Sequence, residues 1–347
     1  MPRLFFALIF IFAASFTHAA EVTDLYQAQL PVASQSEQER LHLAPELLKQ
    51  VIIKVVGDRQ AVQQADISAL TTDAKRYIEQ YSYQQVTTID NDTTDQQLAL
   101  TIDFDEQGVN NALQRIGLPI WDKRRPETLF WIAADYEGEQ RMSAEGDEDL
   151  ILATVEQVAK QRGIPLLLPL MDLQDQTQLT FNDVTTGNNS AIQTASERYG
   201  ASIIVTAHLS GNADAAEMRW QAMVGDNTEQ WPSQGALQTA IENGVNELAD
   251  RLGRQFNMPY DTSGALSELS IQVTGIHDYE GYNRLIAYLE SLQAVSEVQV
   301  GSLRGETLDL VLSIQGQPER VQQLLSVGRV VQAEHHDGSQ QYYRLLP

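Results

Sequence analysis

Three aspartates lie at positions in the sequence where α/β enzymes commonly have catalytic groups. Asp135 follows an apolar run at 128–134, and Asp172 and Asp175 follow a second apolar run at 166–171. Ligands of parallel α/β sheets bind beyond the carboxyl ends of the strands, and convergent carboxylates can hold a divalent cation or divide acid and base roles. The competing interpretation is that aspartates begin loops and cap helices for backbone reasons. A metal-assisted hydrolase built on the three aspartates is therefore the alternative function, and no resident cofactor is expected.

The other candidates for a functional site are better explained as structural residues. Adjacent His335 and His336 would point to opposite faces of a strand, so they cannot share one ion, and Gly338 favours a hairpin turn there. Trp231 precedes Pro232 in an expected loop and is the candidate for stacking on a carbohydrate. The sequence contains no nucleophile elbow, phosphate-binding loop or helical zinc motif. We therefore expect no catalytic residues.

Composition excludes several functions. The chain has 347 residues, with 47 acidic and 23 basic residues and a formal net charge of -24. That charge argues against nucleic acid and anionic lipid as partners. The absence of cysteine excludes disulfides, thiolate metal sites and thiol nucleophiles. A hydrophobic fraction of 43% is enough to build real cores.

Residues 1–20 have the three-part pattern of a secretory signal peptide, and the competing interpretation is an uncleaved membrane anchor. Arg3 provides the positive start, Leu4 to Phe12 form the apolar centre, and Ala19 and Ala20 are small residues at an expected cleavage site. No cysteine follows the apolar segment, and no second stretch approaches the roughly 18 residues of a membrane span. We expect a soluble periplasmic protein without direct membrane insertion.

Residues 21–122 are predicted to form an amino-terminal α/β domain. Ser36 and Glu39 have the spacing of a capping box ahead of a helix, and Pro45 predicts that this helix kinks or restarts. The remaining expectations are strands at 22–30 and 98–104, a helical stretch at 74–83 and a helix at 106–116. The charged segment 123–126 marks the predicted domain boundary.

Residues 126–257 are predicted to form a middle α/β domain with a parallel-type sheet and flanking helices. Strands at 128–134, 166–171 and 202–207 alternate with helices at 149–162 and 191–199. A hairpin at 218–224 with a turn at 225–227 and a helix at 237–256 complete it.

Residues 265–347 follow an expected linker at 258–264 and are predicted to be a ferredoxin-like domain. Strands at 269–273, 298–300, 307–314 and 342–345 enclose a helix after Asp278 and a helix opened by Pro318. The resulting order is βαββαβ. The fold class is thus α+β or α/β, with three small α/β subdomains.

Several segments together resemble a known family. They are 26–32, 47–59, 162–173, 198–201 and 343–345. The sequence resembles the proteobacterial family numbered 2066 among domains of unknown function, over nearly all of the mature chain. The resemblance implies an exported envelope protein without an assigned activity, and Pro45 departs from the family pattern in the first helix. The order of elements around 198–205 also looks like the small α/β domains of periplasmic accessory proteins, such as the amino-terminal domain of the Tol-system propeller protein and lipoprotein activators of peptidoglycan synthases.

The leading hypothesis is therefore a non-enzymatic periplasmic protein that binds envelope proteins or peptides. Small α/β units have open sheet edges that can accept a partner strand.

Overall fold

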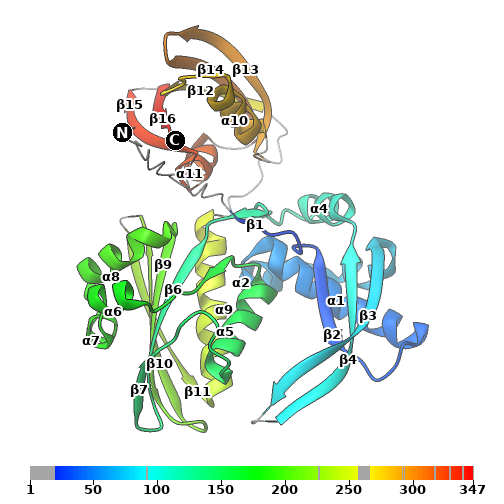
Figure 1. Ribbon diagram of the computed structural model, residues 1–347. Coiled ribbons are helices and arrows are strands. Elements are labelled where there is room, and N and C mark those ends of the chain that lie inside the picture. The colour runs from blue at the N-terminus through cyan, green and yellow to red at the C-terminus, as the bar shows by residue number, and fades with distance from the viewer. Residues whose placement is uncertain are drawn as a thin grey trace, which may run out of the picture.

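The computed structural model describes residues 20–90, 93–225, 227–256, 266–290, 292, 294–315, 318–327, 330–337 and 340–346. Within these ranges the chain forms three units, each with its own sheet and helices (Figure 1), which confirms the predicted mixed α/β class. The predicted signal peptide, apart from Ala20, and the expected linker at 258–264 lie outside the described residues. The turn residues Asp226 and Gly338 lie outside them as well. No helix in the described ranges is long and apolar enough to cross a membrane.

The amino-terminal domain packs one long helix against a three-stranded antiparallel sheet of order β2-β4-β3. Leu47, Val51 and Val55 of the long helix are fully buried against Leu100 and Ile102 of the central strand. The elements are β2 (Gln27–Pro31), α1 (Glu37–Val56), α2 (Arg59–Gln64), α3 (Ser68–Thr72), the 3-10 turn η1 (Ala74–Tyr77), β3 (Ile78–Asp90), β4 (Thr93–Phe104) and α4 (Glu106–Arg115).

The first helix forms one half of its predicted capping box and then continues through its proline. The Glu39 carboxylate accepts from the amides of Ala33 and Ser34 instead of that of Ser36. The Ser36 hydroxyl accepts a hydrogen bond from the Glu39 amide at 3.2 Å, which caps α1. The helix does not restart at Pro45 but runs unbroken to Val56. Because Pro45 has no N–H, the carbonyl of Leu41 loses its helical partner. Leu41 is 41% exposed, and water can satisfy that carbonyl.

The helical stretch predicted at 74–83 is wrong beyond its first turn. After the short turn η1, the chain enters β3 at Ile78 and pairs with β4 down to Asp90. Tyr81 and Tyr83 lie two residues apart on one face of this strand. Aromatic and β-branched residues favour such a pleated, half-buried surface. The strand predicted at 22–30 is also shorter than expected, because β2 begins at Gln27.

The middle domain has a parallel core that antiparallel strands extend on both sides. The sheet order is β11-β10-β9-β6-β7, and β8 pairs beside the start of β6. Strand β6 is parallel to β8 and β9, and the predicted hairpin forms β10 and β11. The strands are β6 (Thr128–Tyr136), β7 (Glu139–Met142), β8 (Leu166–Leu167), β9 (Ile203–Gly211), β10 (Ala216–Val224) and β11 (Asn227–Gly235).

Helices cover the two faces of this sheet unequally. Helices α5 (Leu150–Arg162) and α9 (Leu237–Phe256) pack on one face, and the short helices α6 (Leu173–Gln178), α7 (Phe181–Thr186) and α8 (Asn189–Ser196) lie on the other (Figure 1). The 3-10 turn η2 (Glu197–Tyr199) follows α8. The strand predicted at 166–171 stops at Leu167, because Pro169 has no N–H for a ladder and Met171 has a φ of 50°.

The carboxy-terminal domain follows the predicted order, with one unpredicted strand, β15, inserted before the last. Its elements are β12 (Leu266–Thr274), α10 (Tyr279–Glu290), β13 (Val295–Arg304), β14 (Thr307–Gln315), α11 (Pro318–Val327), β15 (Val331–Asp337) and β16 (Gln340–Leu345). The sheet order is β13-β14-β12-β16-β15. The last two strands form a hairpin, so β16 returns beside β12 and runs parallel to it. A ferredoxin-like βαββα frame therefore carries one strand more than predicted.

The first two domains share a buried joint centred on Arg125. The strands β1 (Ala20–Glu21) and β5 (Arg124–Arg125) pair there, and the Arg125 side chain is fully buried. Its guanidinium donates to the carbonyls of Arg162 and Gly163 at the end of α5 and of Lys54 at the end of α1, at 2.7–2.9 Å. A cation at two helix carboxyl ends is favoured by both helix dipoles. The predicted boundary segment thus ties two domains together.

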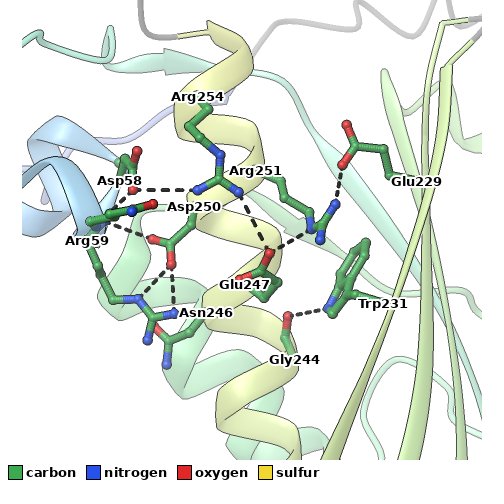
Figure 2. Close-up of polar contacts among 12 residues, drawn as sticks. Asp58, Arg59, Glu229, Trp231, Gly244, Asn246, Glu247, Asp250, Arg251 and Arg254 are labelled. Carbon is green, nitrogen blue, oxygen red and sulfur yellow. Dashed lines mark hydrogen bonds and ion pairs between the residues drawn. The ribbon is translucent and has the colours of Figure 1, made fainter.

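A second buried group joins the same domains through Asp250 of α9. Its carboxylate accepts from the Arg162 guanidinium at 2.6 Å. It also accepts from the side chain and backbone of Arg59 of α2, at 2.8 and 3.0 Å (Figure 2). Close backbone packing lies beside it, because a Cβ added to Gly253 would come within 2.5 Å of the Gly57 carbonyl. The charged group and the glycine contact hold α9 against the end of α1.

Candidate functional site

A polar groove lies on the face of the middle sheet that α6–α8 cover only in part. Its volume is about 800 Å³, which is within the range of small-molecule sites. Strands β6 and β9 end beside it, and His208 of β9 pairs with Arg219 of β10 in the sheet register. The lining residues are Asp135, Gln140, Thr180, Phe181, Asn182, Thr185, Thr186, His208 and Arg219.

Alternation along the strands explains why these side chains share one face. In β6, the buried Leu129, Trp131 and Ala133 face α6–α8. Because side chains alternate between the two faces of a strand, Asp135 lies on the same face as these three residues. It lies at the point where α6–α8 no longer cover the strand. Strand β10 behaves in the same way, because Met223 packs under the helices and Arg219 lies four residues away on the same face. The groove is the uncovered, polar end of an otherwise apolar surface.

Helix α7 forms the opposite wall of the groove. A capping box fixes its start, because the Thr180 hydroxyl accepts from the Asp183 amide and the Asp183 carboxylate accepts from the Thr180 amide. The Phe181 ring then meets the His208 ring edge to face, with centroids 6.1 Å apart. Asn182 is exposed beside it. The wall therefore presents one aromatic ring and one exposed amide.

A hydrogen bond between Arg219 and His208 sets the chemical state of the groove. Nη2 of Arg219 lies 2.7 Å from Nδ1 of His208. Because a guanidinium can only donate, Nδ1 accepts, and the imidazole is neutral with its hydrogen on Nε2. Burial of the ring, and then the charge of Arg219, lower the pKa of His208 below its ordinary value, and Asp135 only partly offsets them. His208 thus offers a hydrogen-bond donor at neutral pH and no free basic nitrogen.

Asp135 supplies the acceptor at the other side of the groove. Its carboxylate accepts from the amide of Gln140 on β7 at 3.2 Å, and the residue is partly exposed. Strand β9, with His208, lies between the strands that carry Asp135 and Arg219. The groove therefore has an anionic acceptor on one side and a cationic donor on the other, with a neutral donor between them.

The predicted pair Asp172 and Asp175 is brought together, but Arg198 joins it. The Arg198 guanidinium binds both oxygens of Asp172, at 2.8 and 3.0 Å, and reaches Asp175 at 3.1 Å. Hydrogen bonds from Arg198 lower the pKa of Asp172 to about 2. Asp175 is fully buried, and its carboxylate accepts from the Tyr199 hydroxyl at 2.5 Å. These carboxylates fix α6 against η2.

Asp135 does not join that pair, since it lines the groove with His208 and Arg219. Among the described residues, no three histidine or acidic side chains are placed to hold one metal ion. His335 and His336 pair with Tyr342 and Gln341 along the β15–β16 hairpin.

The expectation of an exposed Trp231 is wrong. Trp231 lies in β11, is only 5% exposed and stacks on Trp220 with ring centroids 6.3 Å apart. Its indole N–H donates to the carbonyl of Gly244 in α9 (Figure 2). Pro232 does not break the strand, because β11 is an edge strand and its proline does not have to donate to a neighbour. Trp231 is a core residue under α9.

Sequence reasoning missed Arg219, Phe181 and the role of His208. The alternation of Met218, Trp220 and Ala222 with Arg219 and Gln221 signals a strand with one apolar and one polar face. That signal does not say which polar side chains of other strands lie beside Arg219, because the register between β9 and β10 is a property of the folded sheet.

Comparison with known proteins finds a family model that matches part of the chain. Residues 19–122 match the family model described as a domain of unknown function, DUF8605. This confirms a domain of unknown function, but the model is not that of the family numbered 2066 which the motifs resemble. No curated protein matches the sequence. The C-terminal domain of LpoB from Salmonella enterica matches at 19% identity over 37% of this chain and 90% of that one, with a TM-score of 0.24.

Proposed function

We propose that this chain is an exported protein of the bacterial cell envelope that binds its partner in the groove of the middle domain, without catalysis. The observation that carries the proposal is the row Asp135, His208 and Arg219 on adjacent strands of one sheet. The backbone that carries the row is held in place, because the ladder pairs β6 with β9 and β9 with β10 along the full nine residues of each. A preorganised site on strands loses little conformational freedom when a ligand binds.

The protonation state of His208 argues against its use as a general base. A general base needs a free lone pair within reach of the substrate. Nδ1 of His208 already accepts from Arg219, and Nε2 carries the hydrogen. The groove therefore offers fixed hydrogen-bond partners for a polar ligand.

Export is the second part of the proposal, and residues 1–20 support it. Its test is cell fractionation of the full chain. We expect the protein in the periplasmic fraction, with a new amino terminus at Ala20 or Glu21. A chain that keeps Met1 and stays in the cytoplasm would refute the export proposal.

Groove binding is tested by capture from envelope extract on the immobilised mature chain. The variants are R219Q and D135N, and the matched control is E229Q, which changes an exposed charge on β11 outside the groove residues. We expect components retained by the unmodified chain and by E229Q to be lost from R219Q and D135N. Equal retention by all four chains contradicts the proposed groove function.

A further inference from the structure

The separation of charges along the groove restricts the ligand that it can take. Neighbouring strands lie about 4.8 Å apart, so the strands that carry Asp135 and Arg219 are roughly 10 Å apart across β9. Asp135 also lies two residues further along β6 than Ala133, the register partner of His208, which adds about 7 Å along the strands. The His208 ring lies on the strand between them and binds the guanidinium of Arg219 directly. A ligand that contacts both ends must therefore place an anionic group and a hydrogen-bond donor on opposite sides of a ring-sized body.

Smaller and more highly charged ligands fit this row poorly. The single carboxylate of Asp135 and the donor nitrogen of His208 do not form a metal site. A phosphate dianion would find one arginine and would be repelled by the nearby Asp135. A free α-amino acid carries its ammonium and carboxylate on one carbon, which is too compact to span three strands.

A sugar ring suits the remaining groups. Sugar hydroxyls both donate and accept, and they match the carboxylate of Asp135, the exposed amides of Gln140 and Asn182, and the Nε2–H of His208. The partly buried Phe181 ring supplies an apolar wall for the carbon face of such a ligand. Nη2 of Arg219 donates to His208 and to the Thr185 carbonyl, and the other N–H groups of the guanidinium can donate to a carboxylate.

We propose that the groove binds a sugar that carries a carboxylate, with the carboxylate on Arg219 and ring hydroxyl or amide donors on Asp135. This inference rests on the proposed binding function and names its ligand class. It differs from the expected carbohydrate site at Trp231, which is buried on the other face of the sheet.

The test is calorimetric titration of the mature full-length chain with two sugars that differ in one group. N-acetylmuramic acid carries a carboxylate on a lactyl ether, and N-acetylglucosamine has the same ring without it. We expect the acid to bind at least about tenfold more tightly, which is the contribution of one charge-assisted hydrogen bond. In R219Q this preference falls to about onefold, whereas D135N weakens binding of both sugars, and E229Q changes neither.

R219K is a further variant, because lysine keeps the positive charge but lacks the planar guanidinium. It is expected to retain only part of the preference. The exposure of Arg219 makes the fold insensitive to these changes, and an unchanged urea midpoint verifies this for each variant. Equal affinity for the two sugars, a preference that survives in R219Q, or no binding of the acid would each overturn the inference. If R219Q and D135N still lose the components captured from envelope extract, only the ligand class is wrong. If capture is the same with and without these substitutions, the proposed function fails too.

Discussion

Replacing Asp250 with asparagine is expected to loosen the joint between the first two domains. Asp250 is 5% exposed, and the Arg162 side chain that it binds at 2.6 Å is 4% exposed. Removing one partner of a buried ion pair costs about 3–5 kcal/mol, because the other charge stays buried without compensation. The Arg59 side chain is 35% exposed, so its ion pair adds only about 0–1 kcal/mol. We therefore expect D250N to lower the free energy of unfolding by about 3–5 kcal/mol.

Urea denaturation followed by tryptophan fluorescence measures this change. Trp121 reports on the joint, because its ring stacks on Phe256 at 6.2 Å and lies 3.9 Å below the Arg125 guanidinium. At this size the same loss lowers Tm by roughly 6–20 °C. The control is E229Q, because the Glu229 side chain is 52% exposed. Its free energy of unfolding is expected to fall by less than about 1 kcal/mol.

The pH dependence of the same variant is a second readout. Burial alone would raise the pKa of Asp250, but Arg162 and Arg59 outweigh it and hold that pKa below the ordinary value of 3.8. A depressed folded pKa contributes stability that is complete above 3.8 and is lost as the pH falls through the folded value. The difference between the unmodified chain and D250N is thus constant at neutral pH and shrinks only in acid. A D250N chain within about 1 kcal/mol of the unmodified protein at pH 7 would refute the buried-charge reasoning.

Three further changes test other parts of the structure. G244A places a Cβ 2.1 Å from the Trp220 indole, so we expect a loss of about 1–3 kcal/mol in urea titration, and an unchanged midpoint contradicts the packing. Y199F removes the hydroxyl that donates to Asp175 and accepts from the Leu170 amide, and thermal melts are expected to show a loss of about 1–3 kcal/mol. The lowered pKa of His208 gives stability that is complete above its ordinary value of 6.5 and is lost as the pH falls through the folded value. NMR titration of the ring is expected to show that pKa rising in R219Q, and an equal pKa in both chains argues against the pair.

Local sequence patterns correctly predicted those elements that depend only on residues close together in the chain. The cap at Ser36 and Glu39, the helix at 237–256 and the hairpin of β10 and β11 all depend on contacts within a few positions. The prediction at 74–83 was wrong because a helix and an edge strand can share a short amphipathic pattern, and pairing with β4 decides between them. The extra strand of the carboxy-terminal sheet depends on β16 returning beside β12, which is a contact about 70 residues apart in the chain.

The sequence by itself determined the composition, the charge, the mixed α/β class and most helix starts, because each depends on residue type or on hydrogen bonds within one turn. Only the tertiary structure decided which polar groups meet. Asp172 and Asp175 are both bound by Arg198, more than 20 positions along the chain, and Trp231 is covered by α9. The row of Asp135, His208 and Arg219 exists because strand register pairs His208 with Arg219 and places Asp135 diagonally beside His208, two residues beyond its register partner Ala133. Register is set by burial of the apolar face across the whole sheet, so short-range sequence patterns do not contain it.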